Sequence, residues 1–198
     1  MLEHGGALRV AASRYRIPLS DWLDLSTGIN PNGWPVPPIP ATVWGRLPEP
    51  DDGLEAAAMA YYDTSLLVPV AGSQAAIQAL PLLRDLGQVG VLSPTYAEHA
   101  HAWRRVGHPV DLLTADRLDA ALDRLDALVV VNPNNPTGRR LSLATLLDWR
   151  EQLAARGGWL VVDEAFMDVT PEDSLAGRIG LPGLIVLRSL GKFFGLAG

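Results

Sequence analysis

Residues 128–138 read Leu-Val-Val-Val-Asn-Pro-Asn-Asn-Pro-Thr-Gly, an apolar run that ends in a loop with three asparagines and two prolines. An unbroken, β-branched apolar run is typical of a strand that is buried on both faces, as in a parallel sheet. The prolines then impose an extended, turn-rich backbone with exposed amide side chains. This stretch therefore predicts a buried strand whose carboxyl end carries polar groups, with Asn135 as the best candidate to contact a ligand.

Similar apolar runs occur on both sides of this stretch. They are Leu66–Val70, Val89–Leu92, Val110–Leu113, Leu160–Val162 and Leu184–Leu187. The helix-like stretches between most of them are Ser73–Leu86, Tyr96–Val106, Arg117–Leu125 and Leu143–Arg156. Alternating strands and helices predict an α/β fold with a mainly parallel sheet. Right-handed crossovers then place the carboxyl ends of the strands along one edge, where such sheets bind ligands.

The first third of the chain has a different character. A helix is predicted near Gly6–Tyr15 and a short one at Asp52–Asp63, with a loop rich in proline and glycine from Gly28 to Pro50. We therefore divide the chain into an N-terminal arm with loops, residues 1–50, and a larger domain, residues 51–198.

Composition excludes several functional classes. The 198 residues are 48% hydrophobic and 19% charged, which is typical of a globular protein. A net charge of −6 argues against nucleic-acid or anionic-membrane partners. The absence of cysteine excludes disulfides, thiolate metal sites and a cysteine nucleophile. Without a long apolar run or a basic-then-apolar leader, the sequence predicts a cytoplasmic protein.

Lys192 is the only lysine among sixteen basic residues, and the other fifteen are arginines. It follows the last apolar run in Arg-Ser-Leu-Gly-Lys-Phe-Phe, residues 188–194. Guanidinium does not lose its proton near neutral pH, whereas an amine does, and a desolvated amine is nucleophilic towards a carbonyl. Lys192 is thus a candidate nucleophile, and the alternative is a leftover surface lysine.

Three further strand ends carry polar or aromatic residues. Gly72, Ser73 and Gln74 open a helix and suit an anion, although by themselves they are more simply explained as a glycine turn with a serine cap. Tyr96 follows the second run and either stacks on a planar ligand or packs in the core. Asp163 ends an apolar strand, where a carboxylate can hold a positive ring nitrogen.

The chain lacks the phosphate loop that a nucleotidase would require and the glycine fingerprint of a dinucleotide site. Pyridoxal 5′-phosphate accounts for all of these groups at once, since it has a phosphate, an aromatic ring, a phenolic oxygen, a pyridine nitrogen and an aldehyde. No metal site is predicted.

Three motifs carry a family resemblance: Asn-Pro-Asn-Asn-Pro-Thr-Gly, Val-Val-Asp-Glu-Ala-Phe and Ser-Leu-Gly-Lys-Phe-Phe-Gly-Leu-Ala-Gly. They resemble those of fold-type I pyridoxal-phosphate enzymes of the class I/II aminotransferase superfamily, and of the histidinol-phosphate aminotransferase group in particular. Glu-His-Gly-Gly at residues 3–6, the stretch 25–33 and Ala-Gly-Ser-Gln at 71–74 resemble the threonine-phosphate decarboxylases of cobalamin biosynthesis. The resemblance implies a three-layer large domain of the pyridoxal-phosphate-dependent transferase type.

The resemblance also implies roles for individual residues. Lys192 would bind the cofactor aldehyde covalently and later move the proton at the substrate carbon, and Asp163 would pair with the pyridinium nitrogen. Asn135 would donate to the phenolic oxygen and Tyr96 would stack on the ring. The phosphate would be held by Gly72, Ser73, Gln74 and Ser189, and the substrate by His4, Ile29, Asn30 and Asn135.

Three departures from the family pattern stand out. Phe166 occupies a position where many relatives have a tyrosine that donates to the phenolic oxygen, and Leu47 replaces a tyrosine that reaches the partner subunit. The sequence stops at Gly198, before the expected phosphate arginine and small C-terminal domain. We therefore expect an N-terminal fragment that holds the arm and a truncated large domain.

The leading hypothesis is a pyridoxal-phosphate-dependent carboxy-lyase that converts L-threonine O-3-phosphate to (R)-1-aminopropan-2-ol O-2-phosphate. One alternative is an aminotransferase of the histidinol-phosphate type, and another is a non-catalytic binding chain. The resemblance implies a small phosphorylated amino acid as substrate and a homodimer for the full-length protein.

Overall fold

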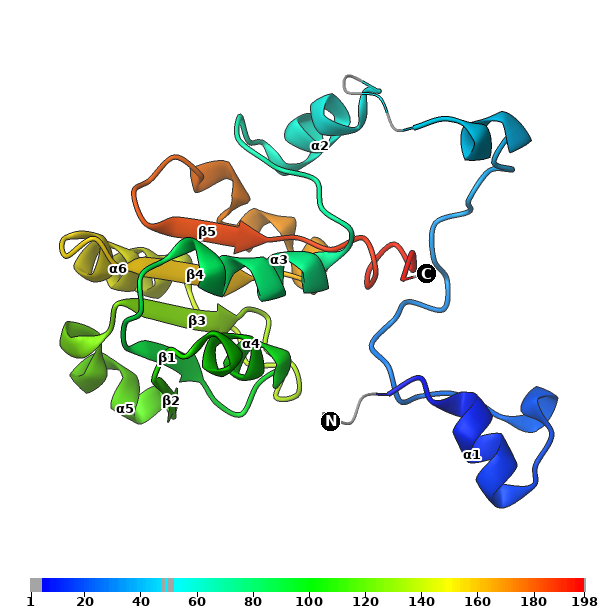
Figure 1. Cartoon of the computed structure of the whole chain (residues 1–198), viewed down its shortest axis with the longest axis horizontal. Helices are drawn as coiled ribbons and strands as arrows, with labels where there is room; N and C mark the ends of the chain where they lie inside the picture. Colours follow the sequence, from blue (N-terminus) through cyan, green and yellow to red (C-terminus); the bar gives the residue numbers. More distant parts are fainter. Residues whose placement is uncertain (1–4, 48, 50–51, 198) are drawn as a thin grey trace.

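Five strands form one fully parallel sheet in the computed structural model, which describes residues 5–47, 49 and 52–197. The strands are β1 (Val89–Leu92), β2 (Val110–Leu113), β3 (Ala127–Val131), β4 (Trp159–Asp163) and β5 (Leu184–Leu187), in the spatial order β2-β1-β3-β4-β5. Every residue of β1 and β3 is buried, as their continuous apolar sequence predicts. The predicted parallel sheet is confirmed (Figure 1).

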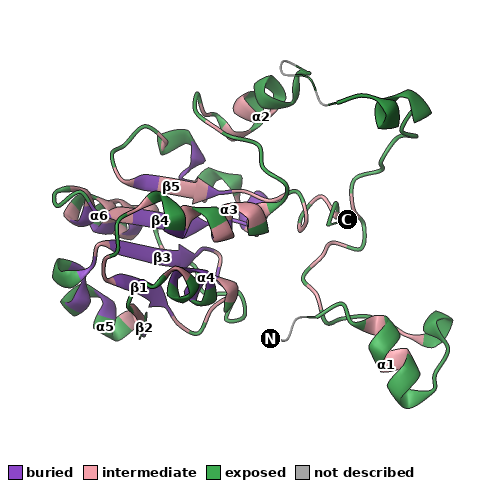
Figure 2. Ribbon diagram, in the orientation of Figure 1, coloured by how far each residue is buried: buried purple, intermediate pink, exposed green. Residues whose placement is uncertain are grey.

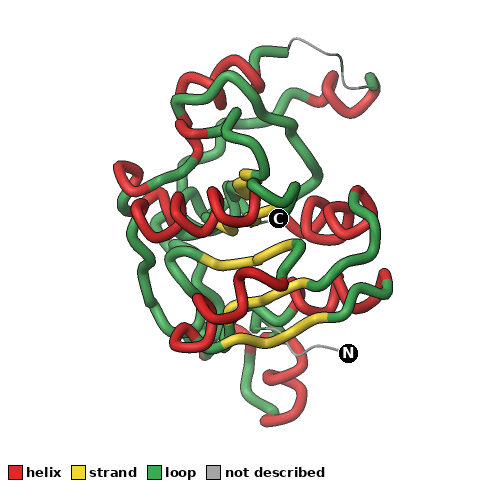
Figure 3. Tube along the Cα trace, turned by 90° about the vertical axis from the view of Figure 1, so that its left-hand side faces the viewer, coloured by secondary structure: helices red, strands yellow, loops and turns green. Residues whose placement is uncertain are grey.

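Helices cover both faces of this sheet (Figures 1 and 3). Leu128 and Val130 of β3 pack on one face, against α5 (Ala115–Leu118), the 3₁₀ helix η4 (Asp119–Arg124) and α6 (Leu143–Ala154). Ala127 and Val129 pack on the other face, with residues of α3 (Ser73–Ala79) and α4 (Glu98–Val106). Side chains alternate along a strand, so one apolar run supplies both cores, and the predicted three-layer architecture is confirmed.

One predicted strand is wrong. Leu66–Val70 forms no strand, and Leu66, Val68 and Val70 are exposed by 61%, 81% and 50%. Within the described part of the chain, β5 pairs only with β4 and no strand lies beside residues 66–70. An apolar, β-branched run needs a hydrogen-bonding partner to become a strand, and this run has none here.

Two predicted helices are shorter or interrupted. The stretch Ser73–Leu86 is α-helical only to Ala79 and continues as the 3₁₀ helix η3 (Leu80–Leu83), because Pro81 has no N–H to donate to the preceding turn. Arg117–Leu125 likewise divides into α5 and η4. By contrast, α6 begins where Ser142 caps it, with Thr145 N donating to Ser142 Oγ at 3.1 Å.

The N-terminal arm lies away from the sheet (Figures 1 and 2). Its elements, and the first helix after it, are α1 (Leu8–Tyr15), η1 (Leu19–Asp21), η2 (Ala41–Gly45) and α2 (Leu54–Tyr62), and none of these contains a buried residue. Three short 3₁₀ helices connect β4 to β5, namely η5 (Met167–Val169), η6 (Pro171–Asp173) and η7 (Ala176–Arg178). The arm approaches the sheet domain through residues 28–34, which contact the segment after β5.

Candidate active site

The candidate residues follow neighbouring strands at one edge of the sheet. The register aligns Val131 of β3 with Asp163 of β4, and Asp163 with Leu187 of β5. The loops after these strands carry Asn135 and Lys192. The sheet therefore brings the ends of the three predicted motifs together, as parallel topology requires.

The three asparagines of the loop after β3 do different things. Asn132 closes the base of the loop, since its Nδ2 donates to Leu141 O at 3.3 Å and its Oδ1 accepts from Leu141 N at 2.8 Å. Asn134 is buried and ties this loop to the one after β1, accepting from Thr95 Oγ1 at 2.6 Å and donating to Pro94 O at 2.9 Å. Asn135 is exposed, and its side chain makes no hydrogen bond to any described residue. Its amide is thus available to a ligand.

Asp163 is held by a histidine that the sequence reasoning missed. His99 Nε2, on α4, lies 2.8 Å from Asp163 Oδ2, and both side chains are buried. Asp163 Oδ1 accepts from Ala165 N at 3.0 Å. Each carboxylate oxygen keeps a free acceptor position, so Asp163 is able to accept one more donor. His99 lies three residues after Tyr96, yet only the packing of α4 on β4 reveals the pair.

Tyr96 begins the segment that leads into α4, and its ring meets the His99 ring edge-on, with centroids 6.1 Å apart. Burial, with the carboxylates of Glu98 and Asp163, raises the pKa of the Tyr96 hydroxyl. The His99 ring thus contacts the Tyr96 ring on one side and the Asp163 carboxyl group on the other.

The predicted phosphate residues fall into two groups. Gly72 has a φ of +75°, and a Cβ placed on it would meet no atom within 4 Å, so the start of α3 faces open space. Gln74 directs its amide to Glu98, with Nε2 donating to Oε2 at 3.0 Å, and Ser73 is the first residue of α3. Ser189 lies after β5, where its Oγ accepts from Gly191 N at 3.1 Å and keeps its own proton free to donate.

Lys192 is half-buried after β5, with Nζ 5.7 Å from the centre of the Phe166 ring. The ring edge of Phe166 faces the arm, because a Cβ on Gly28 would lie 2.9 Å from Phe166 Cε1. Asn30 also reaches this region, with its N donating to Lys192 O at 3.0 Å, and Ile29 precedes it in the chain. His4, predicted to reach the substrate, lies outside the described residues.

The sequence reasoning also missed a buried charged cluster formed by Arg188, Glu164 and Asp168. The Arg188 guanidinium donates to Glu164 Oε2 at 2.8 Å and to Asp168 Oδ1, and it lies 4.7 Å from the centre of the Tyr62 ring. Burial raises the pKa of Glu164 despite hydrogen bonds from Leu175 N, Ser174 and Arg188 that lower it. Glu164 lies within the motif Val-Val-Asp-Glu-Ala-Phe and Arg188 directly precedes Ser-Leu-Gly-Lys, so two opposite charges at the ends of neighbouring strands were the available signal.

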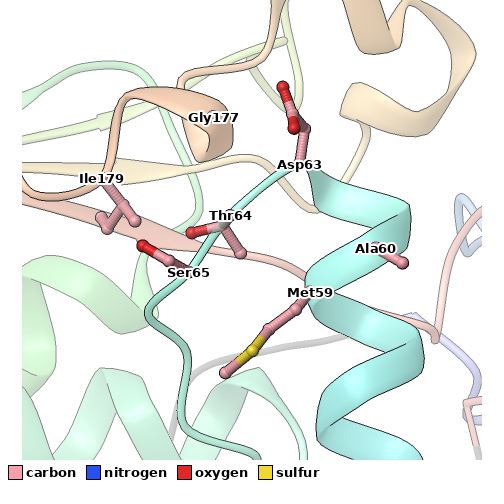
Figure 4. A pocket seen from close by; sticks show the side chains of 7 residues that line it. All are labelled: Met59, Ala60, Asp63, Thr64, Ser65, Gly177 and Ile179. Atoms are coloured by element: carbon pink, nitrogen blue, oxygen red, sulfur yellow. The ribbon is translucent and has the colours of Figure 1, made fainter.

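A cavity of about 470 Å³ lies elsewhere, between the end of α2 and η7 (Figure 4). Its lining residues are Met59, Ala60, Asp63, Thr64, Ser65, Gly177 and Ile179. None of the candidate residues lines it, so the chemistry assigns the site to the strand ends and not to this cavity. Among the described residues no three His, Asp or Glu side chains gather as a metal site, and no helix is long and apolar enough to cross a membrane.

Known proteins resemble this chain in sequence and in fold. The profile of the family described as "Aminotransferase class I and II" matches residues 48–198. The chain is 65% identical over its full length to a threonine-phosphate decarboxylase from Pseudomonas aeruginosa and 47% identical over 203 aligned residues to one from Sinorhizobium sp.. It spans 60% of the length of each. A histidinol-phosphate aminotransferase from Cronobacter sakazakii is 45% identical over only 82 residues, which are 39% of this chain and 21% of that protein.

A solved L-threonine-O-3-phosphate decarboxylase from Porphyromonas gingivalis superposes with a TM-score of 0.66 at 24% identity, covering 78% of this chain and 51% of that one. This likeness supports the fold. The family is pyridoxal-phosphate-dependent, in agreement with the cofactor predicted from the strand-end motifs. The chain belongs to the aminotransferase class I and II family.

Proposed function

We propose that the protein is a pyridoxal-phosphate-dependent lyase that decarboxylates L-threonine O-3-phosphate to (R)-1-aminopropan-2-ol O-2-phosphate in cobalamin biosynthesis. The 65% identity to a threonine-phosphate decarboxylase over the whole chain carries this proposal. Matches to histidinol-phosphate aminotransferases cover less of the chain at lower identity, so the aminotransferase alternative is less favoured.

The available hydrogen-bonding groups fit the cofactor. Asp163 retains acceptor positions for a ring N–H, and Asn135 retains both amide hydrogens for the phenolic oxygen. Ser189 retains its hydroxyl proton, and the open space beside Gly72 leaves room for a phosphate. In this proposal Tyr96 supplies the ring face, and Ser73 and Gln74 complete the phosphate contacts.

When bound, pyridoxal phosphate supplies a ring that accepts the electrons released as the bond between Cα and the carboxylate breaks. The Asp163 carboxyl group would pair with the ring nitrogen, and His99 holds that group in place. Lys192 would hold the aldehyde, and its amine would supply the proton that the substrate carbon receives. Arg188 is not available to a substrate anion, because Glu164 and Asp168 already engage its guanidinium.

The surroundings of the reaction are also proposals. The substrate is a small phosphorylated amino acid, contacted by Ile29, Asn135 and His4. Asn30, which the family resemblance also assigns to the substrate, is bound instead to the backbone of Lys192 and Phe193. We further propose a homodimer, because the arm exposes Trp34 and Trp44 by 63% and 74% and a second subunit would cover such apolar groups. The division at residue 50, a cytoplasmic location and the absence of nucleic-acid and membrane partners remain predictions.

Borohydride reduction in the presence of pyridoxal phosphate tests the proposal. Peptide mapping is expected to place the phosphopyridoxyl group on Lys192, the only lysine, and not in a Lys192→Arg control. A label confined to the N-terminal amine would refute the assignment and favour a non-catalytic chain.

Activity should then be measured on the chain completed with the C-terminal part of the Pseudomonas relative. Release of CO₂ from threonine phosphate without an added 2-oxo acid supports the lyase. Amino transfer that depends on a 2-oxo acid, without CO₂ release, would favour the aminotransferase.

A further inference from the structure

The arm is attached directly to the segment that carries Lys192. Asn30 N donates to Lys192 O at 3.0 Å, Asn30 Nδ2 donates to Phe193 O at 2.8 Å, and Trp34 N donates to Phe194 O at 2.7 Å. We call residues 28–34 the strap and residues 192–195 the lysine segment. These contacts join residues about 160 positions apart, so the strap is a tertiary feature and not a local turn.

The lysine segment has little support of its own. It contains neither helix nor strand. Its internal hydrogen bond, from Gly195 N to Lys192 O, is 3.2 Å long, and the adjacent bond from Leu196 N to Leu190 O is 3.1 Å. The three bonds from the strap are shorter, so the strap contributes most of the hydrogen bonding that holds this backbone.

Two glycines allow the strap to lie this close. A Cβ on Gly33 would sit 2.7 Å from Phe194 O, and a Cβ on Gly195 would sit 2.8 Å from Gly33 Cα. Gly195 also has a φ of +72°, which side chains disfavour. Larger residues at either position would separate the strap from the lysine segment.

The Asn30 side chain is fully committed as a donor. Its two amide hydrogens go to Phe193 O at 2.8 Å and to Asn32 O at 3.2 Å, while its Oδ1 accepts from Asn32 N at 2.9 Å. An amide nitrogen has two hydrogens only, so Asn30 has none left for a substrate phosphate, which needs donors. The side chain instead fixes the turn of the strap and attaches it to the residue after Lys192.

We propose that Asn30 is a positioning residue for Lys192, acting through the carbonyls of Lys192 and Phe193 instead of through contact with the substrate phosphate. The proposal rests on the proposed function of Lys192. The strap sets where the lysine amine points, and the N-terminal arm thereby acts on the reacting centre without touching the substrate.

Because Lys192 is the only lysine, its reactivity can be measured without cofactor or turnover. The chain and its Asn30→Ala variant are treated with trinitrobenzenesulfonate, and labelling of Lys192 is expressed relative to the N-terminal amine. Amide hydrogen exchange is followed on peptides that cover the strap and the lysine segment. The matched control is Asn32→Ala, because the Asn32 side chain is exposed and makes no hydrogen bond to a described residue.

Asn30→Ala is expected to speed exchange of both peptides about ten-fold, the effect of losing about one net hydrogen bond, and to raise Lys192 labelling several-fold. Asn32→Ala is expected to behave as the parent. Unchanged rates of hydrogen exchange and of Lys192 labelling in Asn30→Ala would overturn the proposal and favour a substrate-binding role for Asn30.

A second pair of variants guards against a folding defect in Asn30→Ala. Gly33→Ala should displace the strap and reproduce the faster exchange and labelling, whereas Gly45→Ala, with no atom within 4 Å of the added Cβ, should not. Parent-like rates in Gly33→Ala would also contradict the proposal.

Trapping with pyridoxal phosphate and borohydride separates the two proposals. If the parent forms no Lys192 adduct, the proposed function fails, and the cofactor-free rates still decide whether the strap holds the lysine segment. If the parent forms the adduct, Asn30→Ala is expected to form it with an affinity about ten-fold weaker than the parent and Asn32→Ala.

Discussion

Replacing Arg188 with methionine should destabilise the protein strongly, because its two carboxylate partners are buried. The Arg188 side chain is 10% exposed, and its partners Glu164 and Asp168 are both 0% exposed. Asp168 Oδ2 is also buried without a hydrogen-bond partner among the described residues. Removing the cation therefore leaves two buried carboxylates uncompensated, which costs about 3–5 kcal/mol.

The control is Arg124→Met, which breaks the pair with Asp111. Those two side chains are 54% and 36% exposed, so the loss should stay below about 1 kcal/mol. Because roughly 1 kcal/mol shifts the Tm of a domain of this size by about 2–4 °C, Arg188→Met should lower the Tm by about 6–20 °C. Thermal and urea unfolding of the parent and both variants measure the difference.

The effect should also depend on pH. Burial raises the pKa of Glu164, and Arg188 is one of the groups that oppose this rise. Without Arg188 the Glu164 carboxyl therefore binds its proton still more tightly in the folded than in the unfolded protein, and stability falls further as pH rises. The deficit of Arg188→Met is therefore full near neutral pH and shrinks as pH falls towards about 4, the ordinary carboxyl range. A deficit no larger than that of Arg124→Met, or one independent of pH, would refute the reasoning.

Three further predictions concern residues of the site and its support. Burial raises the pKa of Glu164 in the folded protein, so ionisation of this carboxyl opposes folding. The free energy of unfolding of the parent, minus that of Glu164→Gln, should therefore fall as pH rises above about 4.5. Urea unfolding from pH 4 to 7.5 measures this difference, and a constant difference would contradict the prediction. His99→Phe removes the donor to Asp163 and should weaken pyridoxal-phosphate binding by about one to two decades, since a hydrogen bond to a charged group contributes about 1.5–3 kcal/mol. Titration of each protein with the cofactor, followed by visible absorbance, measures the affinity. An unchanged affinity would count against a role of the His99–Asp163 pair in binding. Asn134→Ala should lower the free energy of unfolding by about 1–3 kcal/mol, because the half-buried Thr95 hydroxyl and the Pro94 carbonyl lose their partner. Asn135→Ala should leave stability unchanged and weaken cofactor binding, and equal stability losses in the two variants would contradict the division of roles.

Much of the fold was readable from local sequence patterns. The apolar runs that became β1, β3 and β4 are almost wholly buried, as their composition predicts, and alternation along these runs supplies both cores. Leu66–Val70 has the same local pattern and forms no strand, because a strand also needs a neighbour and none of the described residues provides one. Local pattern thus predicts which segments are able to join a sheet, and only pairing decides which of them do.

The residues of the candidate site likewise fall into those that sequence patterns point to and those that only the packed structure reveals. The sequence alone was enough to propose Lys192, Asp163 and Asn135 as candidates, because parallel topology places strand ends on one edge and because a single lysine or an Asn-Pro loop is visible in one short window.

Only the tertiary structure paired His99 with Asp163, joined Arg188 to Glu164 and Asp168, and placed Asn30 on the lysine segment. These partners lie 20 to 163 positions apart in the chain. No local period encodes such pairs; they arise where buried polar groups must find partners once helices, strands and arm are packed.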